Sequence, residues 1–194
     1  MNRAVFLDRD GTVNEEVGYV RDLDQLRLIT GAGAAIKRLN DAGLKVVLVT
    51  NQSGVARGYF PESLVHEAHE RLEQMLGKEG ARIDAVYYCP HHPTAGNAQY
   101  TMTCACRKPG TGLIDQAAED LGLDVKRSYV VGDKWSDVEL GQRAGARSIL
   151  VRSGFAPDDP GNKRPLHIND PDFTAHTLTE AADWIIAQLG PVLK

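Results

Sequence analysis

Short apolar runs alternate with amphipathic stretches along most of the chain. Five runs rich in apolar and β-branched residues predict buried strands, at residues 4–8, 45–50, 83–88, 128–132 and 147–151. Apolar positions at helical spacing predict helices between and after them, at residues 32–42, 61–77, 111–121, 136–144 and 179–189. This alternation predicts a parallel sheet with helices on both faces, an α/β doubly wound fold.

One segment interrupts the alternation. Residues 152–176 are rich in Pro, Asp, Asn and Gly, which favour turns, so we expect a long surface loop there. On the predicted 61–77 helix, His66 and His69 lie three positions apart with no third ligand in view, and we expect both at the surface. The length of 194 residues fits one domain that spans residues 1–194.

Composition narrows the class of protein. A formal net charge of -4 argues against a general surface for nucleic acid or anionic membranes. No apolar stretch approaches transmembrane length, and the N-terminal apolar run is too short and too closely flanked by charge for a signal peptide. All 3 cysteines lie in one polar stretch, which argues against a disulfide framework. We therefore expect a cytoplasmic protein without a membrane partner, and a monomer.

Polar motifs follow three of the predicted strands, and a basic pair precedes one helix. They occupy residues 8–12, 50–54, 132–134 and 107–108. In doubly wound sheets, ligands bind beyond the carboxyl ends of the strands, near the point where strand order reverses. We therefore expect all four motifs to contribute to one site.

The first motif carries two carboxylates, Asp8 and Asp10, whose side chains lean to the same side in an extended segment. One carboxylate can attack phosphorus and form an aspartyl-phosphate. The other can protonate the leaving alkoxide and later deprotonate water. Asp-Gly is also a common turn dipeptide, so a capped turn is the alternative interpretation.

Asp133 adds a third carboxylate to this rim. Mg²⁺ binds carboxylate and phosphate oxygens together, so the set predicts a magnesium site. Asp137 lies one helical turn further on. It could bind the cation directly, orient the ligands, or simply favour the helix N-terminus, and we expect a supporting role.

The remaining polar motifs suit phosphate. The hydroxyls of Thr50 and Ser53, with the backbone N–H groups of the 51–54 turn, can cradle a phosphoryl group. Lys108 offers a point charge for that group, and Arg107 offers a bidentate fork for a second anion. A solvated basic turn is the alternative, but an adjacent metal site would hold this turn rigidly.

That metal site is predicted by the cysteines. Cys89, Cys104 and Cys106, with either His91 or His92, form a Cys₃His set that suits structural Zn²⁺. Ordinary reduced cysteines would more often scatter over strands and helices than gather in one polar loop. The spacing leaves the choice of histidine open, and the expected role of zinc is to order the loop over residues 89–106.

The motifs together resemble the phosphatases of the haloacid dehalogenase superfamily, over residues 4 to 155. They read Asp8-Arg9-Asp10-Gly11-Thr12, Thr50-Asn51-Gln52-Ser53, Arg107-Lys108-Pro109 and Gly132-Asp133-Lys134. The resemblance implies a Rossmann-like parallel sheet of haloacid dehalogenase type, with a minimal cap domain or none and a zinc-binding loop. It also implies an Mg²⁺-dependent cytoplasmic enzyme that removes the 7-phosphate of a small sugar bisphosphate, in the biosynthesis of nucleotide-activated heptose for surface polysaccharide.

The resemblance also implies a role for each matched residue. Asp8 would be the nucleophile and Asp10 the acid and base. Mg²⁺ would be held by Asp8, Asp133 and the backbone carbonyl of Asp10. Thr50 and Lys108 would steady the phosphoryl group. The implied substrate-binding residues are Glu16, Val17, Gly18, Tyr19, Thr50, Asn51, Gln52, Ser53, Arg107, Lys108 and Lys134, and the implied zinc ligands are Cys89, His91, Cys104 and Cys106.

Two alternative functions remain. A histidinol-phosphate phosphatase shares the catalytic turns and a similar zinc loop. A zinc-stabilised binding module without activity is the second, and the intact Asp8, Asp10, Lys108 and Asp133 argue against it. The sequence leaves open the anomer of a sugar substrate.

Overall fold

The computed structural model describes residues 2–154 and 162–190, and these contain one six-stranded parallel sheet. The strands lie in the order β3-β2-β1-β4-β5-β6. Their bounds are β1 (Ala4–Leu7), β2 (Lys45–Asn51), β3 (Ala85–Cys89), β4 (Tyr129–Gly132), β5 (Arg147–Val151) and β6 (Phe173–Ala175). Strand order reverses at β1, the first strand of the chain, which therefore lies in the middle of the sheet.

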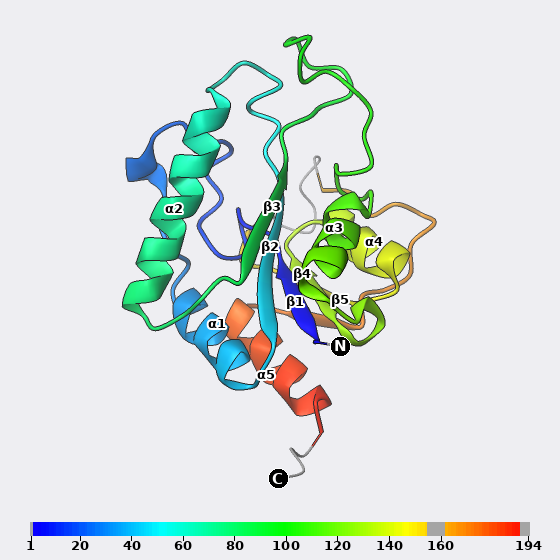
Figure 1. Cartoon of the computed structure of the whole chain (residues 1–194). Helices are drawn as coiled ribbons and strands as arrows, with labels where there is room; N and C mark the ends of the chain where they lie inside the picture. Colours follow the sequence, from blue (N-terminus) through cyan, green and yellow to red (C-terminus); the bar gives the residue numbers. More distant parts are fainter. Residues whose placement is uncertain (1, 155–161, 191–194) are drawn as a thin grey trace.

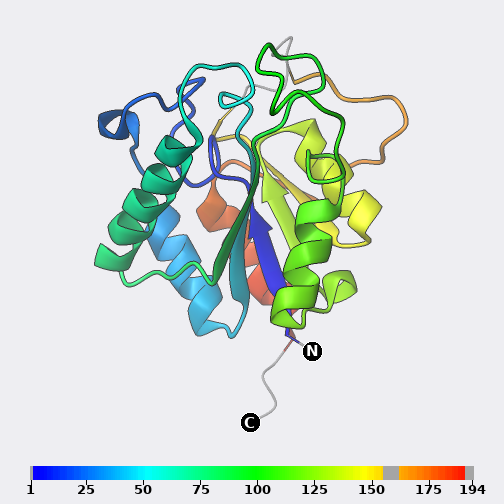
Figure 2. The ribbon, with the colours of Figure 1, turned by 45° about the horizontal axis from the view of Figure 1, so that its top comes forward.

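Helices cover both faces of the sheet and make three layers (Figures 1 and 2). They are α1 (Ala32–Asp41), α2 (Glu62–Lys78), α3 (Gly112–Leu121), α4 (Trp135–Ala144) and α5 (Leu178–Gln188), with short 3-10 helices at Leu23–Gln25 and Val125–Arg127. Helices α1, α2 and α5 share one face, while α3 and α4 share the other. This arrangement confirms the predicted doubly wound α/β fold.

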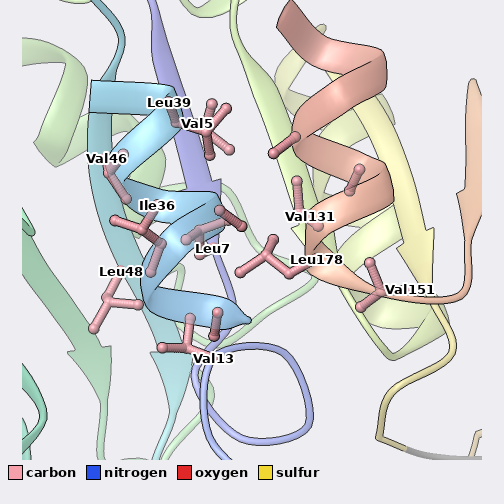
Figure 3. Close-up of a cluster of buried hydrophobic side chains, with 14 of the residues drawn as sticks. Val5, Leu7, Val13, Ile36, Leu39, Val46, Leu48, Val131, Val151 and Leu178 are labelled. Atoms are coloured by element: carbon pink, nitrogen blue, oxygen red, sulfur yellow. The ribbon is translucent and has the colours of Figure 1, made fainter. Parts of the chain in front are cut away.

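Two apolar clusters, one on each face of the sheet, form most of the core. In β1 the side chains alternate, so that Val5 and Leu7 join the cluster under α1 and α5 while Phe6 joins the cluster under α3 and α4. Figure 3 shows the first cluster, where Ile36 of α1 and Leu178 of α5 meet the strand residues. Because both faces are buried, the strands need continuous apolar runs rather than alternation, as the sequence has.

The predicted surface loop at residues 152–176 is wrong in one part. Phe173–Ala175 forms β6, which pairs with β5 from Ile149 to Val151 and extends the sheet. A three-residue strand at an edge has too short a pattern to stand out from flanking Asp, Pro and Asn residues. Residues 155–161 of that expected loop lie outside the described residues.

The loops at the carboxyl ends of the strands gather at one end of the molecule, opposite the N-terminus (Figure 2). They include residues 8–31 after β1 and 90–111 after β3. Within the described ranges all named strands belong to the one sheet, so these loops carry no further sheet. Among the described residues, none of the helices combines the length and apolar character that crossing a bilayer requires.

Candidate active site

Asp8 directly follows β1, and its carboxylate is buried at the strand end. Its backbone N–H donates to the carbonyl of Val131 at 2.9 Å, which fixes Asp8 beside β4. Its Oδ1 accepts a hydrogen bond from the backbone N–H of Arg9 at 2.7 Å and lies 2.9 Å from Nζ of Lys108. Only 4% of the residue is exposed, so the carboxylate is held in one orientation at the floor of the site.

Lys108 is the cation at the centre of the site. Its Nζ lies 2.9 Å from Asp8 and 2.7 Å from Asp137, and donates to the Val49 carbonyl at 3.0 Å, so three donors meet three acceptors. Burial alone would lower the pKa of Lys108, but the carboxylates of Asp137 and Asp8 raise it above its ordinary value. The side-chain amide of Asn51 exchanges two hydrogen bonds with the Lys108 backbone, at 3.0 and 3.2 Å, and anchors it.

Three buried carboxylates form the candidate magnesium site. One oxygen each of Asp8, Asp133 and Asp137 lies within 4.8 Å of the others. Gly11 and Gly154 pack closely here, because a Cβ on either would lie 2.3 or 2.1 Å from Oδ2 of Asp133. An all-oxygen, anionic donor set in this space fits a hard divalent cation.

Asp137 also has partners within the protein, and its supporting role stays a prediction. Its Oδ2 accepts the backbone N–H of Lys134 at 3.1 Å, which caps α4, and its Oδ1 pairs with Lys108. A Cβ on Gly132 would lie 2.2 Å from Oδ2 of Asp137, so only glycine lets this carboxylate lie against β4. Asp137 thereby couples the start of α4 to the central lysine.

Asp10 faces different partners from Asp8. Its carboxylate receives hydrogen bonds from Arg9, Asn14 and Gln52, at 2.8 to 3.1 Å. Burial would raise the pKa of Asp10, but the Arg9 guanidinium and the donated hydrogen bonds outweigh it and lower the pKa to about 2. The carboxyl is therefore ionised at neutral pH in this arrangement.

A cavity of about 390 Å³ opens above these groups. Nine of the predicted substrate-binding residues line it: Glu16, Gly18, Tyr19, Asn51, Gln52, Ser53, Arg107, Lys108 and Lys134. Thr50 lies buried behind Gln52, whose Nε2 donates to the Thr50 hydroxyl at 3.0 Å, and Val17 points to solvent with 42% exposed. Arg9, Val20 and Ser136 also line the cavity and carried no signal in the sequence.

Positive charge is concentrated in this cavity. Arg107, Lys108 and Lys134 line it in a chain of net charge -4. Lys134 pairs with Glu16 at 3.2 Å, which draws the loop after β1 toward α4. Burial alone would lower the pKa of Lys134, but the surrounding carboxylates, with Asp8 first, raise it. The cavity thus offers several cationic donors to an anion, although Asp10 and Glu16 also line it.

The Cys₃His cluster is assembled at the end of β3. Sγ–Sγ distances among Cys89, Cys104 and Cys106 are 3.2 to 3.6 Å, and Nδ1 of His91 lies 3.4 Å and 3.7 Å from two of the sulfurs. Ligands around one tetrahedral Zn²⁺ with Zn–S bonds of ~2.3 Å lie ~3.5–3.8 Å apart. The Sγ–Sγ distances in the cluster are also far longer than the S–S bond of a disulfide. The donor set fits zinc.

The structure also separates the two candidate histidines. His91 belongs to the cluster, whereas Nε2 of His92 lies 3.0 Å from the Arg57 guanidinium. Next to the cluster, Arg107 donates to the His91 carbonyl at 3.0 Å. The loop that carries the Cys₃His cluster therefore fixes the position of a cavity residue.

One predicted surface histidine is buried. His66 is exposed as expected, but His69 is only 6% exposed and its Nε2 lies 3.4 Å from Nη1 of Arg9. Burial and the Arg9 charge lower the pKa of His69 to about 3, so the ring is neutral. The expectation was wrong because α2 turns this face toward the buried Arg9, a contact that helical spacing alone does not reveal.

Comparison with known proteins places this geometry in context. A family model described as HAD-hydrolase-like matches residues 105–181. D-glycero-D-manno-heptose-1,7-bisphosphate 7-phosphatase of Thermosynechococcus vestitus is 45% identical over 192 residues, 97% of each chain. D-glycero-beta-D-manno-heptose-1,7-bisphosphate 7-phosphatase of Escherichia coli is 40% identical over 188 residues, 96% of this chain and 90% of the relative.

A solved structure is similar over nearly the whole chain. It is D,D-heptose 1,7-bisphosphate phosphatase from B. bronchiseptica in complex with magnesium and phosphate. The TM-score is 0.82 at 30% identity, and the match covers 96% of this chain and 99% of that one.

Proposed function

This chain belongs to the heptose-1,7-bisphosphate 7-phosphatases among the HAD-like hydrolases, and from that premise we propose that it hydrolyses the 7-phosphate of D-glycero-D-manno-heptose 1,7-bisphosphate. The observation that carries the proposal is the buried Asp8–Lys108–Asp137 centre beneath a cavity that Arg107 and Lys134 also line. This arrangement would combine a nucleophile, Asp8, with one anion site at Lys108 and a second at Arg107 and Lys134.

The reaction would proceed in two displacements. A carboxylate oxygen of Asp8 attacks phosphorus, and the bond from phosphorus to the sugar oxygen breaks. Asp10 is ionised in the arrangement described above, but the negative charge of the bound phosphate would raise its pKa, and the protonated carboxyl then donates its proton to the sugar oxygen. Water then attacks the aspartyl-phosphate while Asp10 takes its proton, which releases phosphate and restores Asp8. Lys108 and Thr50 would steady the phosphoryl oxygens through both steps.

Mg²⁺ would be held by Asp8, Asp133 and the backbone carbonyl of Asp10. When bound, it would offset the negative charge that the attacking carboxylate meets on the phosphate. Asp137 would support this site by holding Lys108 and the start of α4.

A bisphosphate suits the rest of the cavity. While the reacting phosphate lies near Asp8, Arg107 and Lys134 would meet the second phosphate, which stays on the sugar. Arg107 presents a planar fork that matches phosphate oxygens. The substrate loop at residues 16–19 would complete the site, and Gly18 and Tyr19 from it line the cavity.

A substrate panel tests the proposal. We expect kcat/KM for the heptose 1,7-bisphosphate to exceed that for histidinol phosphate by at least about 10²-fold, because only the bisphosphate engages both cationic regions. Both anomers should be assayed, since the E. coli relative is named for the beta form and the Thermosynechococcus relative for neither. A preference for histidinol phosphate would refute the substrate assignment. The comparisons with heptose phosphatases favour the first outcome.

For the cysteine cluster we propose structural zinc, bound by Cys89, His91, Cys104 and Cys106. Four protein ligands leave no open position, so the ion would order the 89–106 loop without taking part in chemistry. Thiolate ligands of this kind persist in a reducing compartment, which agrees with a cytoplasmic step in heptose activation for surface polysaccharide.

Metal analysis tests the zinc proposal. We expect about one equivalent of zinc per purified chain, and a loss of zinc in Cys104→Ser and His91→Ala. His92→Ala is the matched control and should keep its zinc, because His92 faces Arg57 instead of the sulfurs. Zinc that survives His91→Ala but disappears with His92→Ala would contradict the ligand set.

A further inference from the structure

Arg9 lies between the two catalytic aspartates in sequence, yet its side chain is among the most buried in the protein, at 1% exposed. Its guanidinium forms a fork on the Asp10 carboxylate: Nε to Oδ1 at 3.1 Å, and Nη2 to Oδ1 and Oδ2 at 2.9 and 2.8 Å. On its other side, Nη1 lies against His69 at 3.4 Å. A fork of this kind fixes the plane of the carboxylate as well as its position.

Gln52, the residue directly after β2, completes the contact. Its Oε1 accepts from Nη2 of Arg9 at 3.0 Å, and its Nε2 donates to Asp10 at 2.9 Å and to the Thr50 hydroxyl at 3.0 Å. All polar atoms of this 5% exposed amide are thus engaged inside the protein. Asn14 supports the same carboxylate from the third side, with Nδ2 at 2.9 Å from Oδ1.

We propose that Arg9 and Gln52 are positioning residues that hold the Asp10 carboxyl in register with Thr50, and so place the acid and base beside the phosphoryl group. This inference rests on the proposed function for the role of Asp10. It changes the role of Gln52, which the sequence predicted as a direct substrate contact. A proton donor must lie within hydrogen-bond reach of the leaving oxygen, and a displacement of ~1 Å can cost about 10² in rate.

The choice of leaving group isolates this role. A sugar alkoxide needs a proton as it departs, whereas p-nitrophenolate leaves as a stable anion. The parameter kcat/KM reports on the steps up to phosphorylation of Asp8, and in these steps Asp10 acts only as an acid. A residue that positions Asp10 therefore affects the sugar phosphate much more than the aryl phosphate, while a general loss of structure lowers both.

We expect Gln52→Leu to lower kcat/KM for the heptose bisphosphate by about 10²-fold and for p-nitrophenyl phosphate by about threefold or less. Arg9→Lys keeps the charge but loses the fork. Its kcat/KM for the heptose bisphosphate, divided by its kcat/KM for p-nitrophenyl phosphate, should lie between the values for Gln52→Leu and the wild type. The loss on the sugar substrate should appear in kcat more than in KM.

Gln142→Leu is the matched control. The Gln142 amide also makes internal hydrogen bonds, to the backbone of Asn169 and Asp170, but it lies on α4 away from the cavity. The kcat/KM for the heptose bisphosphate relative to that for p-nitrophenyl phosphate should therefore stay at its wild-type value. Equal losses on both substrates in Gln52→Leu, or a rise in KM alone for the sugar, would overturn the inference. A wild-type enzyme that ignores heptose bisphosphate but hydrolyses another alkyl phosphate refutes only the proposed function, and the ratio is then measured with that alkyl phosphate.

Discussion

Asp8→Asn is expected to lower kcat by about 10⁴-fold or more while the protein stays folded. The amide has nearly the shape of the carboxylate but is a poor nucleophile toward phosphorus. Lys108 keeps its ion pair with Asp137 in the variant, so the buried charge is not left alone. Phosphate release with saturating substrate measures the activity, and circular dichroism measures the fold.

Asp183→Asn is the control for this substitution. Asp183 of α5 makes an exposed ion pair with Arg38 of α1, and neither residue lines the cavity, so the activity of the variant should equal that of the wild type. In the wild type, a beryllofluoride adduct should form on Asp8. An Asp8→Asn protein with undiminished turnover, or an adduct on another side chain, would contradict the covalent mechanism.

The second large effect is expected at Lys108, where Lys108→Met should lower both stability and activity. Its ammonium is the shared partner of Asp8 and Asp137, and removal of one member of a buried ionic group costs about 3–5 kcal/mol. Loss of a group that steadies transferring charge should lower kcat by about 10²–10³. Urea unfolding in magnesium-free buffer measures the first effect, and phosphate release with magnesium measures the second.

Lys37→Met provides the comparison. Lys37 pairs with Asp41 on the surface of α1, where both side chains are about half exposed, and such pairs contribute at most about 1 kcal/mol. If Lys108→Met unfolds at the same urea concentration as the wild type, the buried carboxylates do not depend on this cation.

The features predictable from sequence are those with a repeated local pattern. The parallel sheet followed from apolar runs between helices, and the predicted bounds of β5 match Arg147–Val151. The gathering of Asp8 and Asp133 followed from topology, because the carboxyl ends of the adjacent parallel strands β1 and β4 must meet. Cys89, Cys104 and Cys106 were recognisable because thiols rarely cluster in a polar loop without a metal.

What sequence missed depends on contacts between distant segments. β6 exists because it pairs with β5, and its three residues have no pattern of their own. The sequence assigned no role to Arg9, and nothing local shows that His69 and Gln52 contact its side chain. The division of partners between Asp8 and Asp10 likewise depends on distant side chains, with Lys108 from the loop before α3 on Asp8 and Gln52 from the turn after β2 on Asp10.

The order of strands in the sheet has a consequence for synthesis on the ribosome. The half-sheet β3-β2-β1 can form as soon as its three strands have emerged, but β1 then exposes an open edge until β4 is made, since Val5 pairs with Tyr129. Asp8 directly follows this strand, so the proposed nucleophile is translated among the first residues but acquires its surroundings only after β4 and the start of α4 are made. Nascent chains that stall before β4 would present an unpaired strand to other chains, and should be clients of chaperones rather than partly active enzymes.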